Sequence, residues 1–151
     1  MSALVFRSGQ VHLRKFRVTS ETVITPGTFV CVVNDYLVPA SSQPTATEVA
    51  ASFAGVSHQR SEAGQTAAVS VDVSPLAVYE CDAEVDSYEV GDLIATAVDV
   101  SPLDTTVAAA DTPDEAIAMA AEFADVGQTR LRVTLASTVC TASSHSLAQI
   151  G

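Results

Sequence analysis

Three histidines, together with many serines and carboxylates, are the residues with which this chain could do acid–base or nucleophilic chemistry. His12, His58 and His145 are scattered along the sequence, and none has a second metal ligand beside it. His58 with Asp72 or Asp92 is the pair to test for a Ser/His/Asp arrangement, but so many serines and aspartates allow such a trio to be assembled by chance. The chain also lacks a glycine-rich phosphate loop, a GxSxG elbow and an HExxH helix. The sequence therefore favours a structural or binding protein over an enzyme, and we expect no cofactor and no metal.

Four carboxylates alternate with other residues in the segment Glu80–Asp86. On a strand, Glu80, Asp82, Glu84 and Asp86 would share one face. Such a face could chelate a hard cation loosely, but the segment lacks the glycine-turned loop and the bidentate end residue of a calcium site. We interpret it as a solvated strand face whose charges repel one another. A cation- or carbohydrate-binding β module remains a minor alternative.

The three cysteines, Cys31, Cys81 and Cys140, give an odd count with wide spacing. No CxxC or Cys/His ligand pattern accompanies them, so the sequence indicates neither a disulfide framework nor a zinc site. Each lies among apolar or β-branched neighbours. We expect all three to be buried and to behave as small hydrophobic residues.

The charge of the chain is divided unevenly. The formal net charge is −11, yet the first twenty residues contain four basic residues and no acidic one. A body this acidic repels nucleic acid, whose binders need a basic surface. The basic segment 1–20 predicts an arm that contacts an acidic neighbour, with a solvated edge strand as the alternative. The candidate partner-binding residues are Arg7, Arg14, Lys15, Phe16 and Arg17.

Length and composition bound the class of protein. A chain of 151 residues, 48% of them hydrophobic, is long enough to bury one core and has no low-complexity run. Its apolar runs are far shorter than the roughly 18 residues of a membrane span, and the first ten residues lack the apolar core of a signal peptide. We expect a soluble protein made in the cytoplasm, without a membrane or nucleic-acid partner.

The elements that must position these residues are mostly strands, because apolar and polar residues alternate along much of the chain. In the segment 130–135, Leu131, Val133 and Leu135 share one face. Two dipeptides predict turns: Pro26-Gly27 fits a type II turn, and Asn34-Asp35 fits a tight hairpin.

Two segments are ambiguous between helix and strand. EVAASFAGVSHQ (48–59) can form a short helix or a strand, and Gly55 within it indicates a close approach to a neighbouring strand. In DTPDEAIAMAAEFAD (111–125), Thr112, Pro113 and Glu115 spell a helix N-terminus, and alanines follow at helical spacing. The alternative is a strand at Ala116–Ala124 that fills both sides of a thin sheet.

The hexapeptide VDVSPL occurs twice, at 71–76 and 98–103, with flanks that share no pattern. An internal repeat is therefore not indicated. In the first copy we expect one long strand that bends at Ser74-Pro75, with Leu76 and Val78 returning to the core face. In the second copy we expect the strand to end and lead into a loop.

The order of several short motifs resembles the phage and prophage capsid decoration (cement, head-stabilising) proteins. The motifs are Gly55-Val56, Ala63-Gly64 with Val69 and Val71, Val90 to Ile94 (VGDLI), an alanine-rich segment, and Gly127 to Leu135. Together they cover roughly residues 20–136. Three segments are longer than the decoration-protein pattern requires: Met1–Ser20, Ser41–Ala51 and the linker Leu103–Pro113.

This resemblance implies a compact, mainly β fold: an antiparallel β-barrel at 21–136, an extended N-terminal arm at 1–20 and a C-terminal tail at 137–151, with one short helix as an option. It places a strand at Ala116–Ala124, and we adopt that strand. It also implies a homotrimer on the outer surface of an icosahedral bacteriophage head that binds the major capsid protein and stabilises contacts between capsid subunits. The alternative within the virion is a tail-tube or head-fibre base protein. No catalytic residue follows from the resemblance.

Overall fold

A computed structural model describes residues 3–97 and 104–139 of the chain. The described residues form eleven strands, one α-helix and two short 3-10 helices. The strands are β1 (Val5–Gly9), β2 (Leu13–Phe16), β3 (Phe29–Val33), β4 (Tyr36–Pro39), β5 (Phe53–Ser57), β6 (Val69–Asp72), β7 (Ala77–Ala83), β8 (Leu93–Thr96), β9 (Thr106–Ala109), β10 (Ala118–Ala120) and β11 (Arg130–Leu135). The helices are η1 (Ala40–Ser42), α1 (Ala46–Ser52) and η2 (Pro113–Glu115). The mainly β fold with one short helix is thus confirmed.

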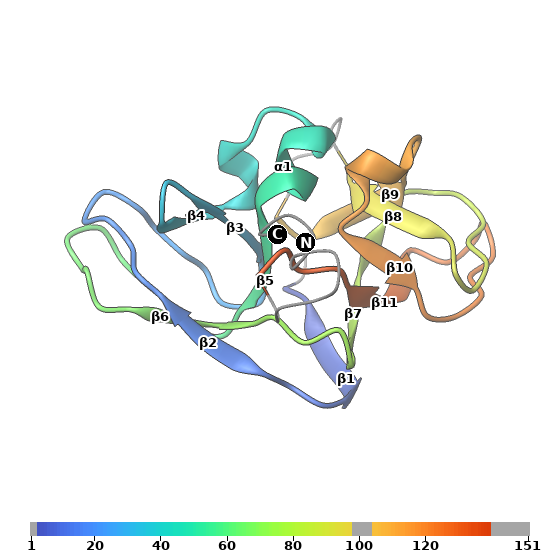
Figure 1. Cartoon of the computed structure of the whole chain (residues 1–151). Helices are drawn as coiled ribbons and strands as arrows, with labels where there is room; N and C mark the ends of the chain where they lie inside the picture. Colours follow the sequence, from blue (N-terminus) through green and yellow to red (C-terminus); the bar gives the residue numbers. More distant parts are fainter. Residues whose placement is uncertain (1–2, 98–103, 140–151) are drawn as a thin grey trace, which may run out of the picture.

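Five strands close into a small barrel, seen in the right half of Figure 1. Their order is β7-β11-β10-β8-β9, and β9 returns to β7 as a parallel pair while the other neighbours are antiparallel. The expected barrel is therefore present, with one parallel pair that makes it mixed rather than purely antiparallel. Closure removes free strand edges from these five strands.

A second, antiparallel sheet has the order β2-β6-β5-β3-β4. It lies beside the barrel in Figure 1. Its two edges curl toward each other, because the Leu37 N–H of β4 donates to the carbonyl of Arg17, just after β2, at 2.9 Å. The curled sheet surrounds its own apolar cluster, which includes Val30, Leu37 and Val71.

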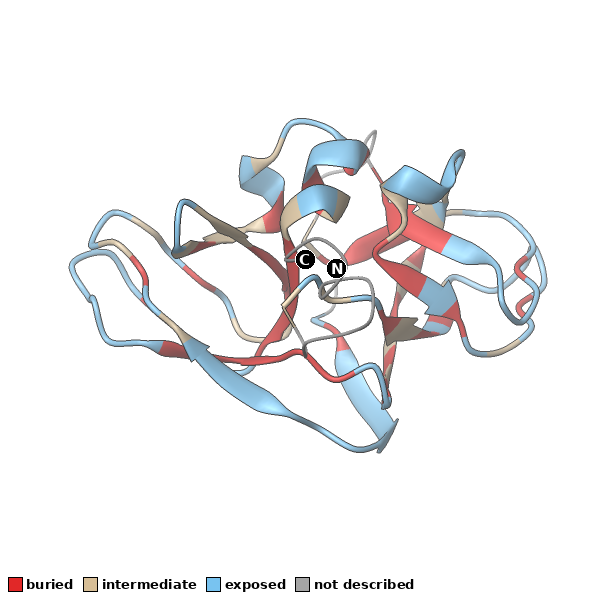
Figure 2. Ribbon diagram, in the orientation of Figure 1, coloured by how far each residue is buried: buried red, intermediate tan, exposed pale blue. Residues whose placement is uncertain are grey.

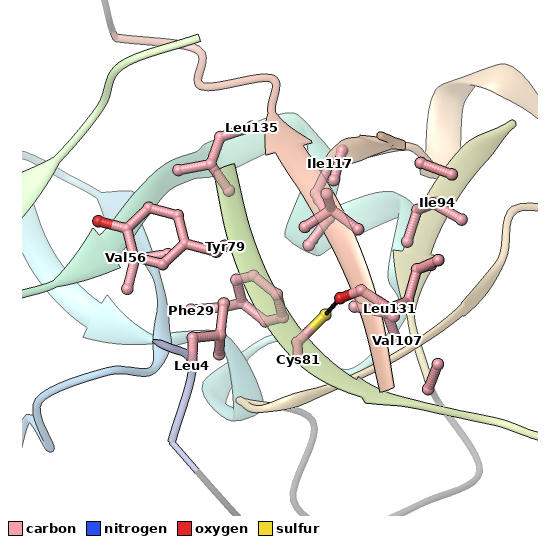
Figure 3. Close-up of a cluster of buried hydrophobic side chains, with 14 of the residues drawn as sticks. Leu4, Phe29, Val56, Tyr79, Cys81, Ile94, Val107, Ile117, Leu131 and Leu135 are labelled. Atoms are coloured by element: carbon pink, nitrogen blue, oxygen red, sulfur yellow. Dashed lines mark hydrogen bonds between the residues drawn. The ribbon is translucent and has the colours of Figure 1, made fainter. Parts of the chain in front are cut away.

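The main core fills the barrel and the space between the barrel and the second sheet (Figures 2 and 3). Along β7 the burial alternates, with Tyr79 and Cys81 pointing inward and Glu80 outward. The same alternation on β11 buries Leu131, Val133 and Leu135, as the sequence predicts.

Cys31 and Cys81 are buried and free, which confirms the expectation for these two, while Cys140 lies outside the described residues. The Cys81 thiol lies 3.6 Å from the Leu131 carbonyl oxygen in the barrel core (Figure 3). Burial raises the pKa of Cys31 to about 11 and that of Cys81 to about 12. Both thiols are therefore held in their unreactive, protonated form.

The predicted turns and the close approach at Gly55 are present. Asn34 and Asp35 have φ of 51° and 73° and join β3 to β4 as a two-residue hairpin, while Gly27 has a φ of 74°. Gly55 lies so close to β6 that a Cβ atom there would be 2.0 Å from the Asp72 carbonyl oxygen. Glycine is required at this position because the two backbones touch.

Each of the two segments that were ambiguous between helix and strand contains a helical part followed by a strand. Residues 46–52 form α1, whose N-cap Thr45 accepts a hydrogen bond from the Glu48 N–H at 3.2 Å, and β5 follows directly. In the second segment the helix-start residues form only the 3-10 turn η2, and Ala118–Ala120 is the strand β10. The expected strand is therefore confirmed over three residues. The local helix signal is overridden because β10 completes the barrel between β11 and β8.

The prediction for the first VDVSPL copy is wrong. β6 ends at Asp72, and Ser74-Pro75-Leu76 carries the chain from the second sheet into β7 of the barrel. Leu76 is 61% exposed and does not lie on the core face. Because Pro75 has no N–H to give to a ladder, it fits the crossing between two sheets better than the interior of one strand. The second copy lies outside the described residues.

The basic N-terminal segment is built into both sheets. β1 pairs with β7, β2 pairs with β6, and Leu4 and Val18 on either side are buried in the two cores. The edge-strand alternative therefore describes residues 5–16, and the segment does not extend away from the body as an arm. Most of the tail 137–151 lies outside the described residues, but the Thr138 N–H donates to the Phe53 carbonyl at 2.9 Å.

Candidate partner-binding surface

Residues 5–16 form one long edge that runs along both sheets. Val5 is opposite Glu80 in β7, and Phe16 is opposite Val69 in β6, so the segment lies antiparallel to 69–80. β1 and β2 each have one strand neighbour and stand at the end of their sheet order. Every residue of β1 is exposed, and the long pale-blue ribbon in Figure 2 follows this edge. An exposed edge of this kind is a template for pairing with another chain.

Arg7 belongs to an ion-pair cluster on the outer face of the barrel. Its guanidinium lies 2.9 Å from the Glu80 carboxylate, which also contacts Arg130 at 3.3 Å and Arg132 at 3.6 Å. Arg130 reaches Asp82 at 2.7 Å as well. The guanidinium groups of Arg7 and Arg130 lower the pKa of Glu80. The interpretation of Glu80 and Asp82 as a mutually repelling face is therefore wrong, since arginines from two neighbouring strands neutralise them.

The other candidate residues diverge in their contacts. Arg14 donates to the Val139 carbonyl and lies over the Phe16 ring, 5.9 Å from its centroid. Phe16 is half-buried and packs against the core of the second sheet. Arg17 pairs with Asp35 and stacks on the Tyr36 ring at 4.6 Å.

Lys15 is exposed and makes no ion pair with any residue that the structure describes. The five candidates thus lie along one edge but do not form one site. Arg7 and Arg17 form ion pairs with carboxylates of the same chain, and Phe16 packs against the core of the second sheet. Lys15, together with the side of Arg14 that no carboxylate covers, carries the positive charge that a partner can reach.

Sequence reasoning missed the apolar character of this edge. Leu13 is 49% exposed on β2, and the corner where the chain crosses between sheets exposes Val11 and Leu76. Beside them is a shallow hollow of about 360 Å³, lined by Gln10, Val11, His12, Ser74, Pro75 and Leu76. The corner is tight because Gly9, at a φ of 91°, passes so close to Leu76 that a Cβ would be 1.9 Å from its carbonyl oxygen.

A buried polar network holds this edge to the body. Asp72 is fully buried, and its Oδ1 accepts the N–H groups of His12 at 3.0 Å and Ser74 at 2.9 Å. Its Oδ2 accepts the Tyr79 hydroxyl at 2.6 Å, and that hydroxyl lies 2.7 Å from the His58 Nε2. Because the only proton of Tyr79 is given to Asp72, Nε2 of His58 is the donor in the second bond.

The network brings His58 and Asp72 close together, the pair that the sequence offered for a catalytic trio. The residue between them is the phenol of Tyr79 and not a serine hydroxyl, and Asp72 is occupied by two backbone donors. Burial and the Asp72 carboxylate raise the pKa of Tyr79 far above its ordinary value, so the phenol does not ionise. The network therefore serves to fix the junction between the sheets.

Glu80–Asp86 and the other titratable groups of the described residues do not gather into a metal site. Within residues 3–97 and 104–139, no group of three or more histidine, cysteine, aspartate or glutamate side chains could hold a metal ion. The helices in these two ranges are also too short or too polar to cross a membrane.

No protein-family model matches the sequence, and no curated protein is significantly similar to it.

Proposed function

We propose that this chain is a structural virion protein, a capsid decoration protein that binds the outer surface of a bacteriophage head. Its partner is the major capsid protein, and its role is to stabilise contacts between capsid subunits. The protein does no catalysis in this role.

One observation carries the proposal: an exposed, partly apolar strand edge, residues 5–16, is fixed to a closed and otherwise acidic β body. Adding this edge to a strand of another chain would draw affinity from main-chain hydrogen bonds. The acidic body would keep crowded copies soluble on a lattice. The ordered sequence motifs that resemble decoration proteins support the same assignment.

The contact would use the free edge of β1. Val5 and Phe6 are about 40% exposed there. The opposite edge of β1 pairs with β7, and the Arg7–Glu80 ion pair links the two strands. Removal of the whole segment 1–20 is not a clean test, because it deletes the buried side chains of Leu4 and Val18. A single substitution at the exposed Val5 changes the edge and leaves the buried Leu4 and Val18 in place.

The experiment is binding to purified heads assembled from the major capsid protein of the same phage. We expect stoichiometric occupancy by co-sedimentation and extra density on the outer surface by electron microscopy. Val5→Ser should weaken binding by about tenfold, as for an interface residue of moderate weight. Val23→Ser is the matched control, since Val23 is similarly exposed (46%) but lies outside the edge.

Absence of the wild-type protein from the heads would refute the capsid role. Growth of the isolated protein into long tubes in negative-stain images would favour the tail-tube alternative instead. Equal binding by the Val5 and Val23 variants would contradict the assignment of the β1 edge.

A further inference from the structure

Exposed large apolar side chains gather on two separate parts of the described surface. The first group, here called the acidic barrel patch, lies on β8, β10 and the adjoining loops. It consists of Val85, Val90, Leu93, Met119, Phe123 and Val126. The second group, called the basic edge patch, lies on β2 and the neighbouring corner. It consists of Val11, Leu13 and Leu76 with the cations Arg14 and Lys15.

The acidic barrel patch is a supported surface and not a pair of free loops. Leu93 and Met119 are opposite each other in the β8–β10 ladder, and both are exposed. The pairing continues beyond the strands, because Tyr88 and Ala124 exchange backbone hydrogen bonds at 2.8 and 2.9 Å. The Tyr88 ring is buried, and its hydroxyl donates to the Glu84 carbonyl. Phe123, 56% exposed, is next to this anchor.

Carboxylates are interspersed in sequence with the apolar residues of this patch. The carboxylates are those of Glu84, Asp86, Glu89, Asp92, Glu122 and Asp125. None of them forms an ion pair within the residues that the structure describes. The partner that fits here therefore has exposed apolar side chains with cations beside them.

The basic edge patch has that composition. Leu13 and Lys15 share the face of β2 that points away from the core, and both are exposed. Arg14 lies on the opposite face, over the Phe16 ring, and bonds a carbonyl rather than a carboxylate. The adjoining hollow of about 360 Å³ between Val11 and Leu76 is large enough to receive an apolar side chain. Figure 1 shows β2 on the lower left and the loops beyond β8 and β10 at the far right, so the two patches face different sides.

From this complementarity we propose that the protein associates with itself head to tail, the acidic barrel patch of one copy docking on the basic edge patch of the next. Phe123 is the apolar anchor, and Lys15 faces the carboxylates at Glu89 and Glu122. Pairing two acidic barrel patches would oppose like charges, so a symmetric contact through that patch alone is disfavoured. A contact between two different patches closes into a ring or grows into a filament, depending on the rotation between copies.

This inference does not depend on the proposed capsid role. Self-association is measured on the purified protein alone, and binding to heads is measured separately. Either result can fail while the other stands.

The test is sedimentation equilibrium of the full chain, whose protomer mass is 15.6 kDa, between micromolar and millimolar concentrations. We expect the wild type to form species of higher mass at low salt, weakening as salt rises because the rim charges are exposed. Phe123→Ser should weaken association by at least about tenfold, as expected for an apolar anchor. Val23→Ser, which changes an exposed apolar residue outside both patches, should leave association unchanged.

Charge reversal tests whether the two patches meet each other. Lys15→Glu alone and Glu89→Lys alone should each weaken association, because each opposes like charges where position 15 of one copy faces position 89 of the next. The double variant Lys15→Glu/Glu89→Lys should restore it within one chain, since the two patches are again complementary. A far-UV circular dichroism spectrum like that of the wild type establishes that each variant is folded.

A wild type that remains monomeric at millimolar concentration and low salt overturns the proposal. So does association that Phe123→Ser leaves intact, or a double variant that associates no better than the single ones.

Discussion

Tyr79→Phe is the substitution that most directly tests how the N-terminal edge is held to the body. The change removes one hydroxyl and keeps the ring, which is 2% exposed and packs edge-to-face with Phe6. Oδ2 of Asp72 then loses the hydroxyl that it accepts at 2.6 Å, while Oδ1 keeps the two backbone donors. A buried carboxylate oxygen is left without its partner.

The expected cost follows from the kind of bond that is lost. A hydrogen bond to a charged group contributes about 1.5–3 kcal/mol, and a buried acceptor left unsatisfied incurs its desolvation penalty. For a chain of this size each 1 kcal/mol lowers the melting temperature by roughly 2–4 °C. Tyr79→Phe should therefore lower the free energy of unfolding by about 2 kcal/mol and the melting temperature by roughly 4–8 °C.

Urea unfolding followed by circular dichroism gives the free energy, and amide hydrogen exchange shows where the loss acts. The His12 amide should exchange faster in the variant, because it donates to the same carboxylate. Tyr36→Phe is the matched control: it also removes a phenol hydroxyl, but Tyr36 contacts Arg17 through its ring. A Tyr79→Phe variant within about 0.5 kcal/mol of the wild type would refute the structural role of the network.

Three further outcomes follow from the described contacts. Gly55→Ala should destabilise the fold by about 3 kcal/mol or more in urea unfolding, because the added Cβ would be 2.0 Å from a backbone carbonyl oxygen. Gly127→Ala is the control and should change stability little, because the space around Gly127 is open. Arg7→Gln should cost about 0.5 kcal/mol at pH 7 by the same measurement. The arginine lowers the pKa of Glu80 from its ordinary 4.5, so this stabilisation is present above the unfolded pKa and is lost as the pH falls through the lowered, folded pKa. Burial raises the pKa of Cys81 to about 12, so its thiol should resist iodoacetamide in the native state and react once urea unfolds the chain. Peptide mass spectrometry measures the labelling, and rapid labelling of the native protein would contradict the burial of Cys81.

Local patterns were sufficient wherever the deciding property belongs to the residue itself or to the alternation along one strand. The alternation of β11, the hairpin at Asn34-Asp35 and the close approach at Gly55 are all read correctly from residue types. Each depends on a property of the residue itself: side-chain alternation, tolerance of positive φ, or the absence of a Cβ.

The same patterns misjudged features that depend on a partner strand. Glu80 and Asp82 look like a repulsive run until the barrel places Arg130 and Arg132 opposite them. The helix signal after Thr112 yields to a strand because β10 must fill the gap between β8 and β11.

What the sequence alone determined is that this is a mainly β chain with Cys31 and Cys81 buried, an acidic body and a basic N-terminal segment. Only the tertiary structure decided where those charges act. It turned the basic segment into an edge held by the buried Asp72, paired Arg7 and Arg17 with carboxylates of the same chain, and left Lys15 exposed. The physical reason is that a charge acts through its nearest opposite charge, and in a barrel that neighbour comes from a strand far away in the sequence.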